Sequence, residues 1–377
     1  MNEDRATRYH RLKRQAGIVS LAWSVLLLVG LLWTGWAIAV RTGAESIATH
    51  VGPASWQPGL AVISYVILLS LLNEIGGLPI DFYRGFVVER RYELSNQKIG
   101  SWLVDEVKSY GLGVILGCGA ASLTYWLIRL SPDRWWFPAG VVFALLILMM
   151  TNLAPVLLLP LFYRVKPLEN PVLCLRLVSL AERAGARVVG AYEWGMGAKT
   201  KKANAALTGL GRTRRILISD TMLAEYSEDE IEVVLAHELG HHVHGDIWKG
   251  IVFECALILA GFYLAARLLS GLAASIGLRG SADVAGLPLL LLAAGAVSFV
   301  MMPFAHAMSR RLERHADRFA LDLTRNPAAF ISAMRRLAAQ NLAEERPSRL
   351  VQWLFYSHPP ILERIAAARA FPDGQGG

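Results

Sequence analysis

The sequence predicts a mainly α-helical membrane protein, a polytopic bundle of six spanning helices that carries a small cytoplasmic α/β domain. Three observations predict this class. The 377 residues are 54% hydrophobic and only 18% charged, whereas soluble domains have about 45–50% apolar and about 25% charged residues. Six stretches are apolar and long enough to cross a bilayer, and one long polar segment separates the fourth stretch from the fifth.

The six apolar stretches are the predicted membrane helices. A bilayer core about 30 Å thick requires about 20 apolar residues in a helix. The first stretch is too long for a signal peptide and no A-x-A site follows it, so we expect a retained helix. The fourth is long enough to need a tilt or a break near Pro155. The predicted spans are 17–40, 58–80, 110–128, 135–162, 250–266 and 284–304.

Lysine and arginine fall in every second connection between these spans. Four segments are rich in basic residues, namely the N-terminal tail, 81–108, 163–247 and the tail after 305, whereas 41–57, 129–134 and 267–283 have one or two each. Basic connections face the cytoplasm, so both termini and the polar segment are predicted to be cytoplasmic. This distribution explains most of the net charge of +8. No basic stripe with interleaved aromatics indicates a nucleic-acid partner.

The spans divide the chain into four parts. These are an N-terminal membrane region with four helices (1–162), a soluble segment (163–247), spans five and six (248–305) and a C-terminal cytoplasmic segment (306–377). In the soluble segment the periodicity predicts a helix over 173–184 and strands near 188–194, 203–210 and 214–219. Ser227 and Glu230 match a capping box that opens a further long helix.

That helix contains His237-Glu238-Leu239-Gly240-His241, an H-E-x-x-H motif. Residues four apart lie on one helix face, so both imidazoles can bind one Zn²⁺. Glu238 follows the first ligand, where its carboxylate can hold a water and accept its proton. The alternative is a pair of solvated surface histidines.

A catalytic zinc site requires a third protein ligand. His242 points away, and His244 is seven residues from His237, roughly 10 Å along a helix, too far to share the ion. Glu313 and Asp317 are four apart, so Glu313 could complete a His₂Glu site while Asp317 orients an imidazole. On spacing alone, pairing of both carboxylates with neighbouring arginines is equally plausible. His315 is expected off that face.

These motifs, with Ser309-Arg310-Arg311, resemble the integral-membrane zinc CAAX prenyl proteases of type 1, a gluzincin family with the pattern HExxH…ExxxD. The resemblance runs in order from about residue 92 to residue 364. Its further segments are Tyr92 to Gln97, Pro160 to Phe162 with Pro167 to Glu169, Asn204-Ala205 to Gly209, and Ser357-His358-Pro359-Pro360 with Glu363-Arg364.

The resemblance implies roles that the residues alone leave open. Glu313 becomes the third zinc ligand, and Asp317 supports the site. His358, otherwise a surface histidine before two prolines, becomes a stabiliser of the oxyanion. Asn204 and Ala205 become an edge strand on which an extended peptide pairs, although an ordinary buried strand is the alternative.

We therefore predict a membrane endopeptidase with a zincin-like domain and one Zn²⁺ per chain, acting on membrane-associated or CAAX-like peptides. Alternatives are a membrane-protein quality-control protease of the heat-shock type, and a non-catalytic binding or chaperone protein with a vestigial site. An ion transporter is disfavoured because the ligands lie outside the spans. The expected partners are a peptide substrate and the bilayer, with no nucleic acid and no predicted oligomeric state. Composition favours a bacterial inner membrane.

The sequence also differs from the family in some features, and several of its residues have no predicted role. Eukaryotic members usually have seven spans, and the missing one is expected before residue 17. Glu74 and Glu254 lie inside spans, which suggests a water-filled interior like the helix-walled cavity of the family; snorkelling at helix ends is the competing explanation. No role is predicted for His244, His306 or His315.

Overall fold

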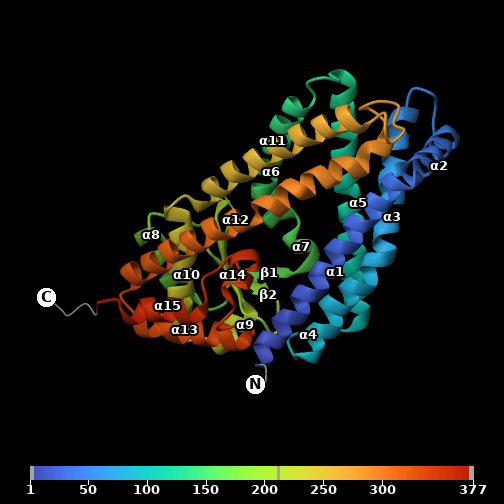
Figure 1. The fold of residues 1–377 in the computed structure, drawn as a ribbon. Coiled ribbons are helices and arrows are strands. Elements are labelled where there is room, and N and C mark those ends of the chain that lie inside the picture. The colour runs from blue at the N-terminus through green and yellow to red at the C-terminus, as the bar shows by residue number, and fades with distance from the viewer. Residues whose placement is uncertain (1–3, 210–212, 373–377) are drawn as a thin grey trace.

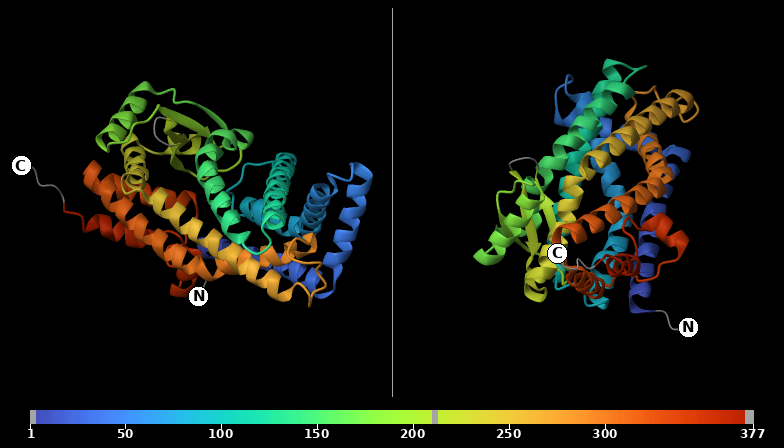
Figure 2. Two further views of the ribbon diagram at one scale, coloured as in Figure 1. Left: turned by 90° about the horizontal axis from the view of Figure 1, so that it is seen from above. Right: turned by 90° about the vertical axis from the view of Figure 1, so that its left-hand side faces the viewer.

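The computed structural model describes residues 4–209 and 213–372, without the side chains of 152 and 154–156. Long helices form an elongated bundle, and the small sheet with its helices sits at one end (Figures 1 and 2). Both described ends of the chain lie near that end, as does the turn after α4. The arrangement is a helical membrane bundle with an attached α/β domain, the class that the sequence predicts.

The N-terminal half is almost entirely helical. A short π-helix at Tyr83–Val87 continues α3 into α4, and Lys13 Nζ donates to the Arg84 carbonyl at this irregular turn, 3.1 Å away. The helices are α1 (Arg5–Trp33), α2 (Trp36–Val51), α3 (Gln57–Phe82), α4 (Val88–Arg91), α5 (Ile99–Leu130), α6 (Trp136–Leu157) and α7 (Leu159–Phe162).

The first predicted span is wrong in its C-terminal part. The apolar run 17–40 is broken by Gly35, which adopts a left-handed φ of 75°, a conformation that favours glycine. The chain turns there, so residues 36–51, expected to end a span and start a loop, form the separate helix α2. Hydrophobicity is similar on both sides of Gly35, and the pattern therefore hides the turn.

Five of the described helices are long and apolar enough to cross a membrane, one fewer than the six predicted. The fourth predicted span, 135–162, contains a shorter apolar helix at Trp136–Thr151. Helix α6 ends at Leu157 and the four-residue α7 follows, so the chain breaks within this span, near the expected Pro155. The five helices are Arg5–Trp33, Gln57–Arg91, Ile99–Leu130, Asp246–Leu272 and Val284–Thr324.

The soluble segment contains a four-stranded sheet in the order β1-β2-β4-β3. Its strands are β1 (Arg164–Pro167), β2 (Ala191–Gly195), β3 (Ala205–Thr208) and β4 (Arg215–Ser219). β2 and β4 are parallel, and the other two pairs are antiparallel. β3 is thus an edge strand, paired on one side with β4.

One face of the sheet packs against helices of the soluble and C-terminal segments. Ile216 and Ile218 of β4 are fully buried against Leu177 of α8 and Leu235 of α10. The helices of these two segments are α8 (Pro171–Arg183), α9 (Asp220–Glu225), α10 (Glu228–Val243), α13 (Pro327–Gln340), α14 (Arg349–Phe355) and α15 (Ile361–Arg369), and all but α14 contribute residues to this core. This core fixes the orientation of α10, the helix that carries the H-E-x-x-H motif.

Two very long helices connect the membrane bundle with this core. α11 (Asp246–Leu272) and α12 (Leu287–Thr324) lie side by side across the molecule. The last turns of α12 leave the apolar bundle and pack beside α10, with Ala320 and Leu321 buried in the same core. The bundle and the soluble segment therefore share α12, and the metal motif meets it at this junction.

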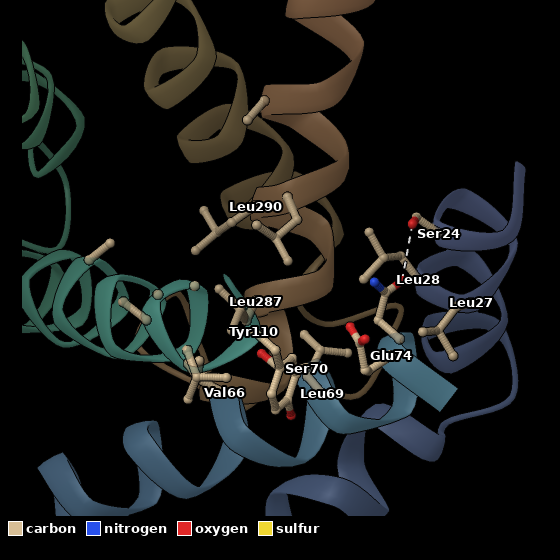
Figure 3. Close-up of a pocket in the computed structure, with 18 of the residues that line it drawn as sticks. Ser24, Leu27, Leu28, Val66, Leu69, Ser70, Glu74, Tyr110, Leu287 and Leu290 are labelled. Carbon is tan, nitrogen blue, oxygen red and sulfur yellow. Dashed lines mark hydrogen bonds between the residues drawn. The ribbon is translucent and has the colours of Figure 1, made fainter. Parts of the chain in front are cut away.

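The membrane bundle encloses a cavity of about 770 Å³ between α1, α3, α5 and α12 (Figure 3). Leucine is the commonest residue of its walls, and Glu74, Glu106 and Tyr110 are among the polar ones. Ser24 donates to Asn73 across the α1–α3 wall at 3.0 Å. Glu74 thus faces the cavity, whereas Glu254 is exposed on α11 and does not line it.

Candidate active site

The site forms where α10 crosses α12, and a glycine permits the close approach. A Cβ added at Gly240 would lie 2.9 Å from the Ala316 Cα and 3.3 Å from its Cβ. Real Cβ atoms do not approach backbone so closely, so any side chain here would separate the helices. Gly240 lies between the two motif histidines, and this contact brings their imidazoles to the face of α12 that carries Glu313.

Three side chains from the two helices converge there. His237 Nε2 lies 3.3 Å from Glu313 Oε2, and His241 Nε2 lies 3.4 Å from Glu313 Oε1. One ligand atom from each of the three residues lies within 4.8 Å of the others, a spacing that could hold a metal ion. The structure thus brings together the two histidines of the motif and the glutamate predicted from the distant segment.

The other ring nitrogen of each histidine contacts a carboxylate. His237 Nδ1 is 2.9 Å from Asp317 Oδ1, and His241 Nδ1 is 2.9 Å from Asp246 Oδ2. A hydrogen bond at Nδ1 fixes the tautomer that leaves Nε2 with its lone pair free, as metal-binding histidines require. Asp317 therefore lies where the sequence predicted an orienting carboxylate for His237. Asp246, at the start of α11, is in the position to orient the imidazole of His241.

The donor set fits a cation. Glu313 Oε2 is buried and makes no hydrogen bond to a described group, a costly state unless another partner binds it. Burial lowers the pKa of His237, yet its contacts with the carboxylates of Asp317 and Glu313 raise it to about 9. The carboxylates of Glu313 and Asp317 thus make the electrostatic environment of the site favourable for a cation. Two imidazole nitrogens and one carboxylate also form the ligand set of known zinc hydrolases.

Glu238 lies beside this cluster with its carboxylate free. No hydrogen bond or ion pair joins it to another described residue. Burial raises the pKa of Glu238, while the neighbouring imidazoles of His237 and His241 act in the opposite direction. A half-buried carboxylate with a raised pKa and no partner can exchange a proton with a water held nearby.

The C-terminal segment closes the other side of the cluster. His358, in the turn between α14 and α15, places Nε2 3.2 Å from Glu313 Oε1, although 60% of its side chain is exposed. Arg364 on α15 donates to both Asp317 oxygens, at 2.5 and 2.8 Å. The structure thus brings His358 to the site, which spacing alone gave no reason to expect.

The remaining histidines lie elsewhere. The rings of His244 and His315 pack against each other with centroids 6.0 Å apart, and neither belongs to the group of potential metal ligands. His306 Nδ1 is buried without a described partner and is also outside that group. His242 is likewise outside that group.

Asn204 and Ala205 lie at the start of the edge strand β3. The Ser219 backbone N–H donates to the Asn204 carbonyl at 2.9 Å, and Ala205 pairs with Ile218. The opposite edge of β3 pairs with no described strand, and the strand lies beside α10. An extended peptide could therefore add to it by main-chain hydrogen bonds.

Sequence reasoning missed three functional candidates. Asp246 follows the motif by five residues, but a helix break at Gly245, with a φ of 65°, brings it back to His241. Arg364 belongs to a segment used for the resemblance, yet its contact with Asp317 was not predicted. Gly240 occupies a variable position of the motif, and only the packing against α12 reveals its role.

The fold and the site together define a class of protein: a membrane-embedded metallopeptidase with an H-E-x-x-H helix and a distant glutamate. The chain belongs to peptidase family M48, whose sequence model matches residues 167–371. Residues 2–164 match the family described as "CAAX prenyl protease N-terminal, five membrane helices". In that range the described structure has five helices of at least 16 residues, α1, α2, α3, α5 and α6, of which α1, α3 and α5 are long and apolar enough to cross a membrane.

Named relatives agree with this assignment. An uncharacterized metalloprotease, YhfN, of Bacillus subtilis (strain 168) is 33% identical over 313 residues, covering 82% of this chain and 73% of the relative. A CAAX prenyl protease 1 homolog of Oryza sativa subsp. japonica is 26% identical, covering 85% and 76%. The crystal structure of S. mikatae Ste24p has a TM-score of 0.85 at 22% identity, covering 96% and 88%, and shows a shared fold.

Proposed function

We propose that this protein is a zinc-dependent endopeptidase whose ion is held by His237, His241 and Glu313. The convergence of these three side chains, with one oxygen of Glu313 buried and without a hydrogen bond, is the observation that carries the proposal. Asp317 and Asp246 would keep the two imidazoles in the tautomer that binds metal. Zinc, when bound, would supply Lewis acidity toward a peptide carbonyl and make water more acidic.

The chain's own residues would carry the proton transfers. Glu238 accepts the proton of the attacking water and then delivers it to the amine that leaves, which requires a pKa near the working pH. Its raised pKa suits this double role. His358 donates a hydrogen bond to the oxyanion as the carbonyl carbon becomes tetrahedral.

The substrate would be an extended peptide paired with β3. Asn204 and Ala205 provide main-chain groups at the free edge of the sheet, next to the helix that carries Glu238. Several relatives are named CAAX prenyl proteases, so peptides with a C-terminal CAAX-like sequence are one substrate class. The apolar cavity in the bundle supports substrates that are themselves membrane-associated, including proteins removed by quality control.

The active site and both termini would face the cytoplasm. The chain would be organised in the four parts that the sequence predicts. The basic connections lie at the end of the bundle that carries the α/β domain (Figure 1). Composition and the Bacillus relative favour the inner membrane of a bacterium. Nucleic acid is not an expected partner.

The decisive experiment replaces the proposed base and leaves every proposed ligand in place. In proteoliposomes, Glu238→Gln should retain one zinc per chain and lose about 10²–10⁴-fold in hydrolysis of a fluorogenic peptide. The control is Glu225→Gln, an exposed carboxylate on α9. Normal hydrolysis by Glu238→Gln would exclude it as the base, and loss of zinc would make it a ligand. Farnesylated and unlipidated forms of a CAAX peptide, compared in the same assay, test the substrate class.

A further inference from the structure

Three residues on one face of α12 hold the C-terminal segment at successive points. Arg310 donates through Nη1 to the carbonyls of Gln352 and Tyr356, at 3.1 and 2.6 Å. Three residues later Glu313 contacts His358, and four residues after that Asp317 binds Arg364. Spacings of three and four place these side chains in one row along a helix. The order of contacts along α12 matches the order along the C-terminal segment.

The Tyr356 carbonyl lies at a weak point of the backbone. α14 is a helix of seven residues, Arg349–Phe355, and the last carbonyls of a helix have no partner within it. Pro359 and Pro360 follow three and four residues after Tyr356 and have no N–H to donate. The Arg310 guanidinium therefore satisfies the end of α14 where the chain turns toward His358.

The side chain of His358 does little to fix its own position. It is 60% exposed, and its described polar contacts are Glu313 and the hydroxyl of the adjacent Ser357. An exposed imidazole is mobile unless the backbone beneath it is held. Its approach to Glu313 must then come from the anchors on either side, Arg310 before it and Arg364 after it.

Arg310 itself is buried, with 8% of its surface exposed, and forms no ion pair with a described carboxylate. A buried guanidinium bonded only to carbonyls is costly compared with an apolar side chain in the same place. A contribution to stability alone therefore does not explain why an arginine occupies this buried position. Its geometry does, because the two N–H groups of Nη1, carried on a rigid helix, donate to both carbonyls at once.

We propose that Arg310 is a positioning residue that sets the distance between His358 and the Glu313 side of the active site. The inference rests on the proposed role of His358 at the oxyanion. A second tether supports the same turn from α1: Arg14 donates to Glu344 at 2.7 Å, and the Tyr356 hydroxyl binds that same carboxylate. This tether acts on the side chain of Tyr356, whereas Arg310 acts on its carbonyl.

The test is a double-mutant cycle on the full-length, zinc-loaded enzyme in proteoliposomes. Arg310→Met keeps the aliphatic stem and removes both donors, while Arg310→Lys keeps a cation that can reach one carbonyl. Arg311→Met is the matched control, because Arg311 is an exposed arginine on the same turn of α12. Each variant is measured alone and combined with His358→Ala, with kcat, KM, zinc content and melting temperature recorded.

We expect Arg310→Met to lower kcat about ten- to a hundredfold, since small displacements of catalytic groups have effects of that size. KM should change less than about threefold, zinc content should not change, Arg310→Lys should restore part of the rate, and Arg311→Met should resemble the wild type. In the His358→Ala background, Arg310→Met should have almost no further effect on kcat, because both changes remove the same interaction.

Additive losses in the double variant would overturn the inference, since Arg310 would then act independently of His358. An unchanged kcat in folded, zinc-loaded Arg310→Met would also overturn it. Failure of the proposed function gives a different result: His358→Ala itself would keep normal turnover, or Glu238→Gln would remain active. The cycle therefore separates a wrong role for Arg310 from a wrong role for the site.

Discussion

At the scale of single residues, the two metal-directed imidazoles depend on carboxylates from different elements. Asp317 supports His237 from α12, and Asp246 supports His241 from the first turn of α11. Asp246 is almost fully buried and also accepts a hydrogen bond from Lys249 at 2.8 Å. Because each carboxylate holds an Nδ1 proton, it also sets the direction of the free Nε2.

Asp246→Asn should therefore weaken metal binding without removing a ligand. The amide can still accept through oxygen, but it is neutral and can also rotate to present its NH₂ group to the ring. Loss of such an orienting carboxylate typically costs about 10–100-fold in metal affinity. Competition with a zinc chelator measures this, and Asp322→Asn, an exposed carboxylate paired with Arg318, is the control. Equal affinities for both variants would show that Asp246 does not orient His241.

At the scale of elements, the contact between α10 and α12 decides whether the three ligands meet. Gly240 allows the axes to approach until its Cα faces Ala316. Glycine in a helix interior costs roughly 0.5–1 kcal/mol relative to alanine. The sequence nevertheless has a glycine in the turn of α10 between the two histidines, where a larger residue would separate the helices.

Gly240→Ala should be destabilising although alanine is the better helix former. The new Cβ would meet backbone at 2.9 Å, and overpacking costs typically about 1–3 kcal/mol, more than the propensity gain. Separation of the helices would lengthen the distances from both imidazoles to Glu313, so zinc affinity should fall with the melting temperature. Gly250→Ala, where the Cβ meets nothing within 4 Å, should be neutral or stabilising. A Gly240→Ala protein with wild-type zinc affinity would contradict this account.

The N-terminus of α10 carries a buried carboxylate whose ionisation links stability to pH. Glu230 accepts hydrogen bonds from the Ser227 N–H at 2.8 Å, from Ser332 at 2.5 Å and from Arg336 at 2.9 Å. Burial raises its pKa, but the hydrogen bonds of Ser332 and Ser227 and the charge of Arg336 outweigh burial, so the pKa is lowered overall. Glu230 thus ties α10 to α13 in its charged form.

A group whose pKa is lower in the folded state stabilises above its unfolded pKa of about 4.3, and this contribution is lost as pH falls through the folded value. We therefore expect the α/β domain to lose stability as pH falls below about 4.5. In Glu230→Gln the loss over this range should be smaller, because no proton binds at that position. Melting curves between pH 7 and pH 3.5 measure the difference. Parallel pH dependence in both proteins would exclude Glu230 as a source.

The sequence predicted most of these elements where local chemistry determines them. The capping box at Ser227 opens α10 as expected, and β2, β3, β4 and α8 begin within about three residues of their predicted positions, whereas β1 was not predicted. The turn at Gly35 and the helix α2 were not predictable from the apolar pattern, because residues 17–40 have no charged side chain on either side of Gly35. The approach of Asp246 and Arg364 to the motif depends on how α11 and α15 pack, and no local pattern records that packing.

At the scale of the whole molecule, charge is segregated between the two ends of the bundle. The N-terminus, the turn after α4, the α/β domain and the C-terminal helices lie at one end, and the α2–α3, α5–α6 and α11–α12 connections lie at the other (Figure 1). Two of the arginines at the second end are neutralised by carboxylates. Arg41 is buried against Asp283, and Arg279 pairs with Glu45 at 2.6 Å.

Basic residues are more numerous at the end with the proposed active site, so by the positive-inside rule we expect that end to face the cytoplasm. A reporter fused after Gly377 should therefore be cytoplasmic, and one inserted in the turn between α2 and α3, residues 52–56, should be on the opposite side. The structure favours this turn as the insertion site. An insertion within residues 41–51 would instead interrupt α2 and the buried Arg41–Asp283 pair. Paired fusions to an enzyme active only outside the cytoplasm and to a protein fluorescent only inside it measure both positions. Both reporters on one side would contradict the arrangement of the spans, and exchanged sides would place the metallopeptidase domain outside the cell.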